Sequence, residues 1–308
     1  MELRQLKYFV TVAKTLNFSE AARRLFITQG TLSQQIKQLE YETGSLLFER
    51  SSHSVRLTEA GEELLPLALK TIADTKECQD RMRDLKGALT GTLNLGTTHS
   101  FTGLMTDTVK NFLKQYPGVD LKIHLDTAAD LLEMLRDGKL DLALAFKPIM
   151  QYDEIESEVL FKTSLSIVMR KGHPLSDKEK IKLEDIEGQG MVLPGRGLQA
   201  RRTFDRFVGL DTRRLNVRVE LNDPNLIMDI VQGTNLVTLL SPLAAYYRPN
   251  LVAIPLEGGH YSMEDNAYPM TGCVHRLKEG YRKRSCEVFL DMLRESAQME
   301  RLYKNLEL

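Results

Sequence analysis

The spacing of apolar residues divides the chain into a short helical region, one long helix, and a region in which strands and helices alternate. Six apolar residues at helical spacing predict the first helix: Leu3, Leu6, Phe9, Val10, Val12 and Ala13. A second helix carries the small residues Ala21 and Ala22, which permit close approach of a crossing helix. Ser19 is its expected N-cap.

The third helix is expected from about Gln29 to Tyr41, with Thr28 as its N-cap. Its apolar face consists of Leu32, Ile36 and Leu39, so polar side chains face outward along its N-terminal half. Gly44 ends this helix, and the sequence Leu-Leu-Phe at 46–48 returns to the core. Residues 50–56, Arg-Ser-Ser-His-Ser-Val-Arg, predict a short basic hairpin, which completes a winged helix-turn-helix unit.

One long helix is expected from its N-cap Thr58 to about Leu89, with Pro66 as the site of a kink or a restart. Its interrupted apolar stripe contains Leu65, Leu69, Ile72, Met82, Leu85 and Leu89. Such a stripe is usually a core face. Here little chain surrounds it, so we expect a partner helix.

Beyond Leu89 the pattern predicts strands at 93–96, 119–125, 140–146, 165–169, 190–193, 217–221, 236–240, 252–256 and 268–274. Helices are expected at 104–116, 128–136, 198–208, 226–231 and about 282–299. Repeated strand-helix-strand units predict a parallel sheet with right-handed crossovers, arranged in two α/β lobes.

The predicted fold class is therefore α+β and multidomain. Residues 1–58 form an all-α winged helix-turn-helix domain and residues 59–89 a linker and dimerisation helix. Residues 90–308 form an α/β two-lobed domain, with lobe I at about 90–162 and 268–308 and lobe II at about 163–267.

Composition narrows the class of protein further. Of the 308 residues, 42% are hydrophobic and 27% charged, as in an ordinary globular protein. The net charge of -1 gives no general attraction to a polyanion, so binding of nucleic acid requires a local basic or polar surface. The absence of a long apolar run and of a signal-peptide pattern leads us to expect a cytoplasmic protein.

Three cysteines, Cys78, Cys273 and Cys286, fit neither a disulfide framework nor a zinc site. We expect reduced thiols, and whether one of them senses redox state stays open. Six scattered histidines and the lack of hydrolase, metalloprotease or nucleotide-binding motifs argue against an enzyme, a metal site or a cofactor.

Gln, Thr and Ser on the outer face of the third helix present donors and acceptors that suit base edges in a DNA groove. The wing adds basic side chains for the phosphate backbone or the minor groove. The candidate DNA-binding residues are Thr28, Gln29, Thr31, Ser33, Gln34, Lys37, Arg50, His53 and Arg56. The alternative is a polar helix that only faces solvent.

Ligands of open α/β sheets bind beyond the carboxyl ends of the strands, where helix N-termini favour an anion. The candidate ligand-binding residues are Thr98, His99, Ser100, Phe101, Thr102, Phe146, Lys147, Arg196, Arg201 and Asn222. The three cations among them predict an anionic ligand. For Ser100 the alternative is ordinary helix capping, and for each cation it is an exposed surface charge.

The first 65 or so residues resemble the LysR-type transcriptional regulators. The resemblance rests on Phe18-Ser19-x-Ala21-Ala22-x-x-Leu25, Gln29-x-x-Leu32-Ser33-x-Gln35-Ile36-x-x-Leu39-Glu40, Gly44-x-x-Leu47-Phe48-x-Arg50 and Leu57-Thr58-x-Ala60-Gly61. Two positions depart from the family pattern: Gly30 stands where proline is common, and His53 where a wing arginine is frequent.

The resemblance implies a periplasmic-binding-protein-like effector domain with a small effector held between its lobes. It also implies a homodimer or homotetramer on double-stranded, pseudo-palindromic promoter DNA, with RNA polymerase as a further candidate partner. Three segments resemble the branch that contains the cyanate-operon regulator: Asp141–Phe146, Gly172–Leu175 and Gly233–Leu240. A solute-binding or transport-related protein is the alternative for the two-lobed domain.

Overall fold

A computed structural model of the chain describes all residues except 52–53, 86, 88, 149–151, 209–214, 247, 258–268 and 306–308. The chain forms two compact units, Met1–Gly87 and Ala88–Leu308. Among the described helices, none is long and apolar enough to cross a membrane.

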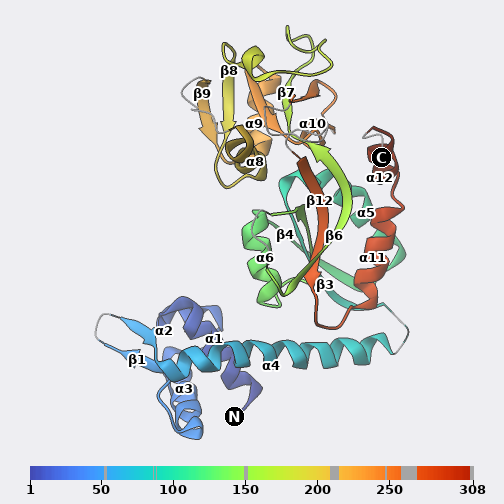
Figure 1. Cartoon of the computed structure of the whole chain (residues 1–308). Helices are drawn as coiled ribbons and strands as arrows, with labels where there is room; N and C mark the ends of the chain where they lie inside the picture. The colour runs from blue at the N-terminus through green and yellow to red at the C-terminus, as the bar shows by residue number, and fades with distance from the viewer. Residues whose placement is uncertain are drawn as a thin grey trace. The chain divides into compact units, whose positions relative to one another are not determined.

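The N-terminal unit consists of helices and one hairpin (Figure 1). Its elements are α1 (Leu3–Thr15), α2 (Phe18–Arg24), α3 (Gln29–Thr43), β1 (Phe48–Arg50), β2 (Val55–Leu57) and α4 (Glu59–Asp84). The core is built around Phe48, whose ring lies 5.4 Å from that of Phe9 and 5.7 Å from that of Phe18. Leu32, Ile36 and Leu39 of α3 are fully buried in the same core.

The helix ends of this unit follow local sequence signals, with one correction. Thr28 and Thr58 are confirmed as N-caps of α3 and α4, and Gly44 ends α3 in the left-handed conformation. The N-cap of α2 is Asn17 and not Ser19, because the Asn17 side chain accepts a hydrogen bond from the Glu20 amide at 3.0 Å. Ser19 instead donates to the side-chain oxygen of Gln29 at 3.1 Å.

The long helix α4 runs through Pro66 and ends at Asp84, before the expected end at Leu89. Its expected stripe is divided between two environments. Leu65, Leu69 and Ile72 pack against the core of the N-terminal unit, whereas Met82 and Leu85 are exposed. Leu89 belongs to the other unit, where it packs against the main core. Gly87, at φ +78°, marks the departure from helical backbone.

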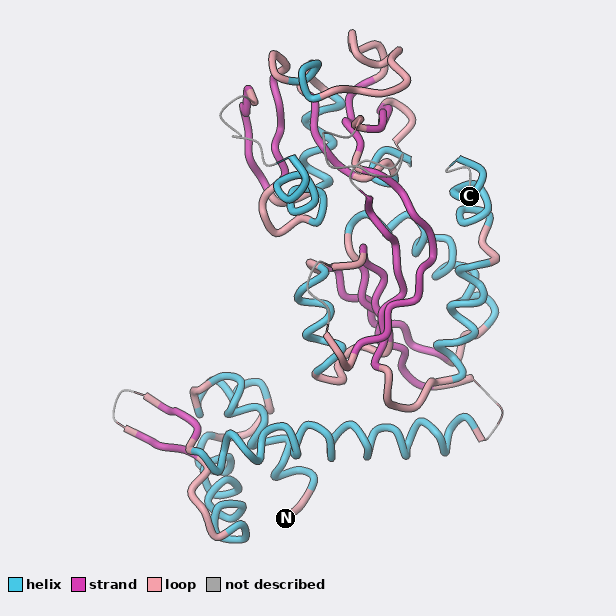
Figure 2. The backbone as a smooth tube through the Cα atoms, viewed as in Figure 1, coloured by secondary structure: helices cyan, strands magenta, loops and turns pink. Residues whose placement is uncertain are grey.

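The C-terminal unit contains two five-stranded sheets, one per lobe (Figure 2). Lobe I contains β3 (Gly91–Thr97), η1 (His99–Phe101), α5 (Thr102–Gln115), β4 (Val119–Leu125), α6 (Ala128–Arg136), β5 (Leu142–Phe146), β6 (Ile155–Ser164), β12 (Pro269–Leu277), α11 (Arg284–Arg294) and α12 (Ala297–Asn305). Lobe II contains β7 (Ser166–Arg170), α7 (Leu183–Ile186), β8 (Gly190–Pro194), α8 (Gln199–Val208), β9 (Asn216–Leu221), α9 (Pro224–Gln232), β10 (Val237–Leu240), α10 (Leu243–Tyr246) and β11 (Leu251–Pro255).

Both sheets are mixed, whereas the strand-helix-strand pattern predicted a parallel sheet. The strand orders are β4-β3-β5-β12-β6 in lobe I and β11-β7-β10-β8-β9 in lobe II. In lobe I, β12 runs antiparallel to β5 and β6, and in lobe II, β7 runs antiparallel to β10 and β11. The remaining neighbours are parallel, as expected for strand-helix-strand units.

Two elements of lobe I differ from expectation. The sequence pattern does not predict the strand β6, because polar residues are interspersed along this edge strand and blur the two-residue alternation. The expected final helix at 282–299 is two helices, α11 and α12, separated at Glu295 and Ser296.

The helices of lobe I cover both faces of its sheet (Figure 1). On one face, Leu131 and Leu135 of α6 pack with Ala143 of β5. On the other face, Phe112 of α5 and Phe289 of α11 pack edge to face, with ring centroids 5.4 Å apart. Because both faces are filled, the open ends of the strands are the parts of the sheet that can accept a ligand.

Candidate nucleic-acid interface and ligand cavity

The outer face of α3 presents polar side chains above a fully buried apolar face. Gln29, Thr31, Gln34 and Lys37 are exposed and Ser33 is half-buried. Its first turn contains no acidic residue. Free amide groups and the helix dipole make such an end attractive to phosphate.

The start of α3 is held in place by local hydrogen bonds. The Thr28 hydroxyl oxygen accepts from the Thr31 amide at 3.2 Å and lies 2.9 Å from the Thr31 hydroxyl. The Gln29 side chain accepts from Ser19, which ties α3 to α2. Side chains held in this way lose less conformational entropy when they meet a binding partner.

The two described cations of the wing differ in their contacts. Arg56 on β2 is exposed. The Arg50 side chain is 30% exposed, but its guanidinium donates to Glu40 at 3.2 Å and lies 4.4 Å from the centroid of the Phe18 ring. His53 lies outside the described residues. Arg50 is therefore placed to hold the base of the wing, and Arg56 is placed to reach a partner.

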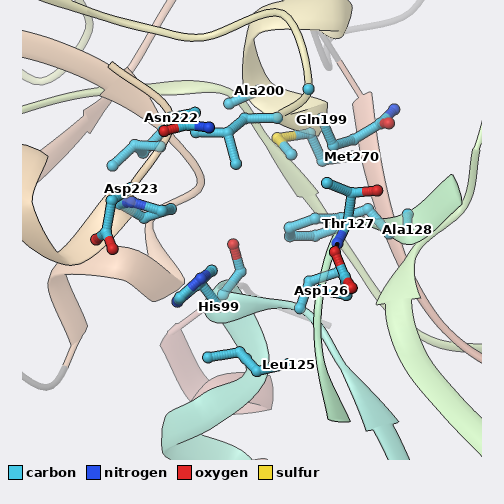
Figure 3. Close-up of a pocket in the computed structure, with 17 residues that line it drawn as sticks. His99, Leu125, Asp126, Thr127, Ala128, Gln199, Ala200, Asn222, Asp223 and Met270 are labelled. Carbon is cyan, nitrogen blue, oxygen red and sulfur yellow. Dashed lines mark hydrogen bonds between the residues drawn. The ribbon is translucent and has the colours of Figure 1, made fainter. Parts of the chain in front are cut away.

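A cavity of about 300 Å³ lies in the C-terminal unit between residues of both lobes (Figure 3). The lining residues are Thr98, His99, Ser100, Leu125, Asp126, Thr127, Ala128, Phe146, Gly197, Leu198, Gln199, Ala200, Asn222, Asp223, Pro224, Leu240 and Met270. Lobe I and lobe II both contribute polar side chains. A ligand held here would contact both lobes at once.

Of the predicted residues, Thr98, His99, Ser100, Phe146 and Asn222 line this cavity. Phe101 and Thr102 do not line it. The Phe101 ring is buried against Phe146, at 5.1 Å between centroids, and the Thr102 hydroxyl donates to the His99 carbonyl at 2.8 Å.

None of the three predicted cations lines this cavity. Lys147 and Arg196 are exposed. Arg201 is buried, and its guanidinium donates to Asp205 at 2.7 Å and to the Pro194 carbonyl at 3.2 Å. Arg201 therefore stabilises lobe II internally, and its charge is already compensated.

Several helix N-termini, rather than the three predicted cations, surround the cavity. The starts of α6, α8 and α9, together with the turn η1 before α5, all contribute lining residues. Thr127 caps α6, and Asp223 caps α9 by accepting the amides of Asn225 at 2.8 Å and Leu226 at 3.0 Å. The bond from the Leu226 amide is the main cause that lowers the pKa of Asp223.

Thr98 and Ser100 bring two hydroxyl side chains to the lobe I wall of the cavity. The N-cap position of α5 is Phe101 and has no side-chain cap, so helix capping does not account for Ser100. The Thr98 hydroxyl is buried and has no hydrogen-bond partner among the described residues. Burial of a hydroxyl without a partner is costly, so a polar ligand group beside it would be stabilising.

Sequence reasoning missed Asp126 and Thr127, which line the cavity and are labelled in Figure 3. Asp126 and Thr127 directly follow β4, whose predicted and observed bounds coincide. Asp223 follows β9 and precedes Pro224, a pattern typical of a helix N-terminus. The rule that ligands lie beyond strand carboxyl ends therefore pointed to these positions.

Two protein-family models together match most of the chain. Residues 3–62 match the model "Bacterial regulatory helix-turn-helix protein, lysR family", and residues 86–298 match the model "LysR substrate binding domain". The chain belongs to the LysR family. The LysR resemblance of the sequence is thereby confirmed, and the chain is a DNA-binding transcriptional regulator with a substrate-binding domain.

Individual relatives agree with this assignment. The chain is 34% identical over 275 residues to the transcriptional regulator ShiR of Corynebacterium glutamicum, covering 83% of this chain and 88% of ShiR. It is 29% identical over 239 residues to the transcriptional activator CmpR of Synechocystis, covering 78% of each. These relatives are transcriptional regulators, and the transport alternative gains no support from them. The resemblance to the cyanate-operon branch stays a prediction.

Solved LysR-type structures share the fold. A full-length variant of OxyR from Pseudomonas aeruginosa matches with a TM-score of 0.68 and 25% identity, covering 96% of both chains. CbnR in complex with its target DNA matches with a TM-score of 0.59 and 21% identity, covering 96% of this chain and 100% of CbnR. The expected combination of a helix-turn-helix unit and a two-lobed α/β unit is therefore confirmed.

Proposed function

We propose that this LysR-type regulator reads promoter DNA with the N-terminal half of α3. The observation that carries the proposal is the outer face of α3, which is polar and has no carboxylate in its first turn. The opposite, apolar face of the same helix is fully buried. Gln34 and Thr31 are exposed there and can bond base edges, while Arg56 of the wing contacts the phosphate backbone.

Binding of two half-sites requires two copies of the chain, and α4 offers a surface for pairing. Leu67, Met82 and Leu85 are each more than half exposed, at 61%, 58% and 78%. They lie on one helical stripe with Cys78. We expect α4 to pair with α4 of a second copy in a homodimer or homotetramer on a pseudo-palindromic site. RNA polymerase stays a candidate partner without a specific contact surface.

The effector that suits the cavity is a small organic acid that also carries hydrogen-bond donors. The N-terminus of α8 and the hydroxyls of Thr98 and Ser100 would hold the acid group, since no Lys or Arg of the described residues lines the cavity. Asp126 and Asp223 would accept hydrogen bonds from the donors of the ligand. A volume of about 300 Å³ limits the ligand to the size of a simple metabolite.

The regulatory step would be a change in lobe closure. The cavity is lined from both lobes, and the side-chain amide nitrogen of Asn225 in lobe II lies 3.4 Å from the His99 ring nitrogen Nδ1 in lobe I. A ligand that contacts both walls favours one lobe arrangement over others, and the arrangement then biases the spacing of paired DNA-binding units.

A mobility-shift assay at several salt concentrations, with DNA from upstream of the chain's own gene, tests the DNA-binding proposal. Gln34→Ala should weaken sequence-specific binding by about 1–3 kcal/mol if one base contact is lost. Gln38→Ala is the matched control, because Gln38 lies one turn further along α3 and bonds Glu42 at 3.1 Å. Equal losses in both variants would argue against base reading by Gln34.

A thermal-shift screen of small carboxylic acids with the full-length chain tests the effector proposal, since a ligand that binds only the folded state raises the melting temperature. Ser100→Ala should remove the shift produced by an active compound and leave DNA binding intact. Ser176→Ala, on the surface of lobe II, should keep the shift. An unchanged response of Ser100→Ala would remove this hydroxyl from the site.

A further inference from the structure

Phe26 is an exposed aromatic residue in an unfavourable backbone conformation. The residue is 96% exposed, and its φ angle is +55°. The left-handed region is disfavoured for residues with a Cβ and especially for bulky ones. Full exposure also leaves the ring without the stabilisation that burial gives to an aromatic side chain.

The local turn explains the conformation but not the choice of phenylalanine. The Phe26 amide donates to the Arg23 carbonyl at 3.2 Å, and the Ile27 amide donates to the Ala22 carbonyl at 3.1 Å. These two bonds form the Schellman motif that ends α2, with Phe26 at the position that glycine or asparagine usually occupies. A smaller residue would therefore satisfy the same turn at lower conformational cost.

The surroundings of Phe26 indicate what its ring contacts. Only Ile27 separates it from Thr28, the N-cap of α3. The side chains of Arg23 and Arg24, just before it, are 78% and 61% exposed. Both guanidiniums pair with the Glu20 carboxylate, at 2.7 Å and 2.8 Å. One apolar ring beside these cations is too small for a protein interface. It fits a DNA groove, where cations meet phosphates and an apolar group can meet a thymine methyl or a deoxyribose.

We propose that Phe26 makes an apolar contact with DNA at the edge of the site read by α3. This contact extends the DNA-reading surface from the recognition helix into the preceding turn. It also accounts for a residue that breaks two local rules at once, since sites that violate local preferences are often functional. The inference rests on the proposed docking of α3.

Phe26→Asn tests the contact, because asparagine tolerates the left-handed conformation. The full-length variant should melt at the same temperature as the wild type or higher, while its dissociation constant for the DNA upstream of its own gene rises about fivefold or more. The dependence of binding on salt should stay unchanged, because no phosphate contact is lost. Tyr41→Asn, which removes an aromatic residue 83% exposed at the other end of α3, should change affinity by less than about twofold.

DNA in which uracil replaces thymine identifies the group that the ring contacts. If wild-type affinity falls to the level of Phe26→Asn, and the variant loses nothing more, the ring contacts a thymine methyl. If uracil has no effect on the wild type, the contact is with deoxyribose. Unchanged DNA affinity of a stably folded Phe26→Asn overturns the proposal. A wild-type chain that gives no sequence-specific shift would refute the docking of α3 itself, which is a separate outcome.

Discussion

The Arg50 guanidinium lies 3.2 Å from the buried carboxylate of Glu40, and this pair joins the base of the wing to α3. The other Glu40 oxygen accepts the backbone amides of Leu47 at 3.0 Å and Phe48 at 3.3 Å. One side chain of the recognition helix therefore satisfies two buried amides and one cation of the segment that leads into the wing. The position of the wing relative to α3 depends on Glu40.

Glu40→Ala should destabilise the N-terminal unit by about 3 kcal/mol, because it leaves two buried amides and Arg50 without their acceptor. Glu40→Gln keeps one acceptor oxygen and should cost less. Chemical denaturation followed by circular dichroism measures both free energies of unfolding. Equal stability of the alanine variant and the wild type would show that the carboxylate is not needed.

Arg50 and Arg56 should respond differently to removal of their charge. Arg56→Ala should reduce the slope of log affinity against log salt by about 1 and leave stability within about 0.5 kcal/mol. Arg50→Ala should mainly reduce stability, by about 1–2 kcal/mol, since its charge is engaged with Glu40 and Phe18. Shift assays over a range of salt concentrations, together with denaturation curves, separate the two effects. A larger salt effect for Arg50 would reverse the assignment.

Features set by nearby residues could be predicted from the sequence, and features set by distant ones could not. The N-caps Thr28 and Thr58 and the bounds of α6 follow from neighbouring residues. The role of Arg201 could not be predicted, because one of its acceptors, the Pro194 carbonyl, is presented by the end of β8 only in the folded lobe.

The ligand cavity could also be predicted from the sequence only in part. The hydroxyl-rich loop at Thr98 and Ser100 could be found as a strand end that leads into a helix. The convergence of this loop with the starts of α6, α8 and α9 depends on the strand order of both sheets. Strand order is a non-local property, and the passage of the chain between lobes through β6 is not visible in the sequence pattern.

His275 should make the C-terminal unit sensitive to acid. Burial lowers the pKa of His275 from 6.5 to about 4, and its ring lies 2.9 Å from the Ser157 hydroxyl and 3.3 Å from the Ala145 carbonyl. Between pH 6.5 and about 4 the unfolded chain binds a proton that the folded chain does not. This contribution to stability is therefore complete above pH 6.5 and is lost as the pH falls, by about 3 kcal/mol at most.

The measurement is the free energy of unfolding in urea across this pH range for the wild type and His275→Gln. The variant should start less stable but lose less stability on acidification. His124→Gln, on β4, controls for loss of an exposed histidine. Parallel pH curves for the wild type and His275→Gln would exclude the buried imidazole as the cause.

The three cysteines should differ in reactivity. Burial raises the pKa of Cys273 to about 11 and that of Cys286 to about 12, so both thiols stay protonated near neutral pH. Cys78 is exposed on α4, on the stripe with Met82 and Leu85. Maleimide labelling followed by mass spectrometry should modify Cys78 in the native chain and the other two only after unfolding.

If α4 pairs with α4 of a second copy, the labelling rate of Cys78 should depend on protein concentration. Labelling should slow as the dimer forms, because the dimer interface covers the stripe that contains Cys78. A labelling rate that stays constant across the dimerisation range would argue against burial of this stripe in the dimer. Rapid native labelling of Cys273 or Cys286 would show that their environment opens readily.

Two glycines of the N-terminal unit should respond in opposite directions to a single added methyl group. At Gly61, a Cβ would lie 2.3 Å from the Leu47 carbonyl oxygen and 2.9 Å from Leu57, so Gly61→Ala should cost about 2 kcal/mol or more through the forced shift of backbone. At Gly30, within α3, a Cβ would meet only the Thr28 hydroxyl, at 3.9 Å. Gly30→Ala should therefore stabilise the unit by about 0.5–1 kcal/mol, because alanine loses less backbone entropy in a helix.

Denaturation of both variants under the same conditions gives the comparison, and DNA affinity adds a second measurement for Gly30→Ala. Since the methyl group makes no close contact within the chain, a loss of DNA affinity with raised stability would mean that the DNA backbone approaches α3 closely at this residue. Unchanged affinity would mean that Gly30 lies outside the contact. A destabilised Gly30→Ala would instead contradict the open space found beside this position.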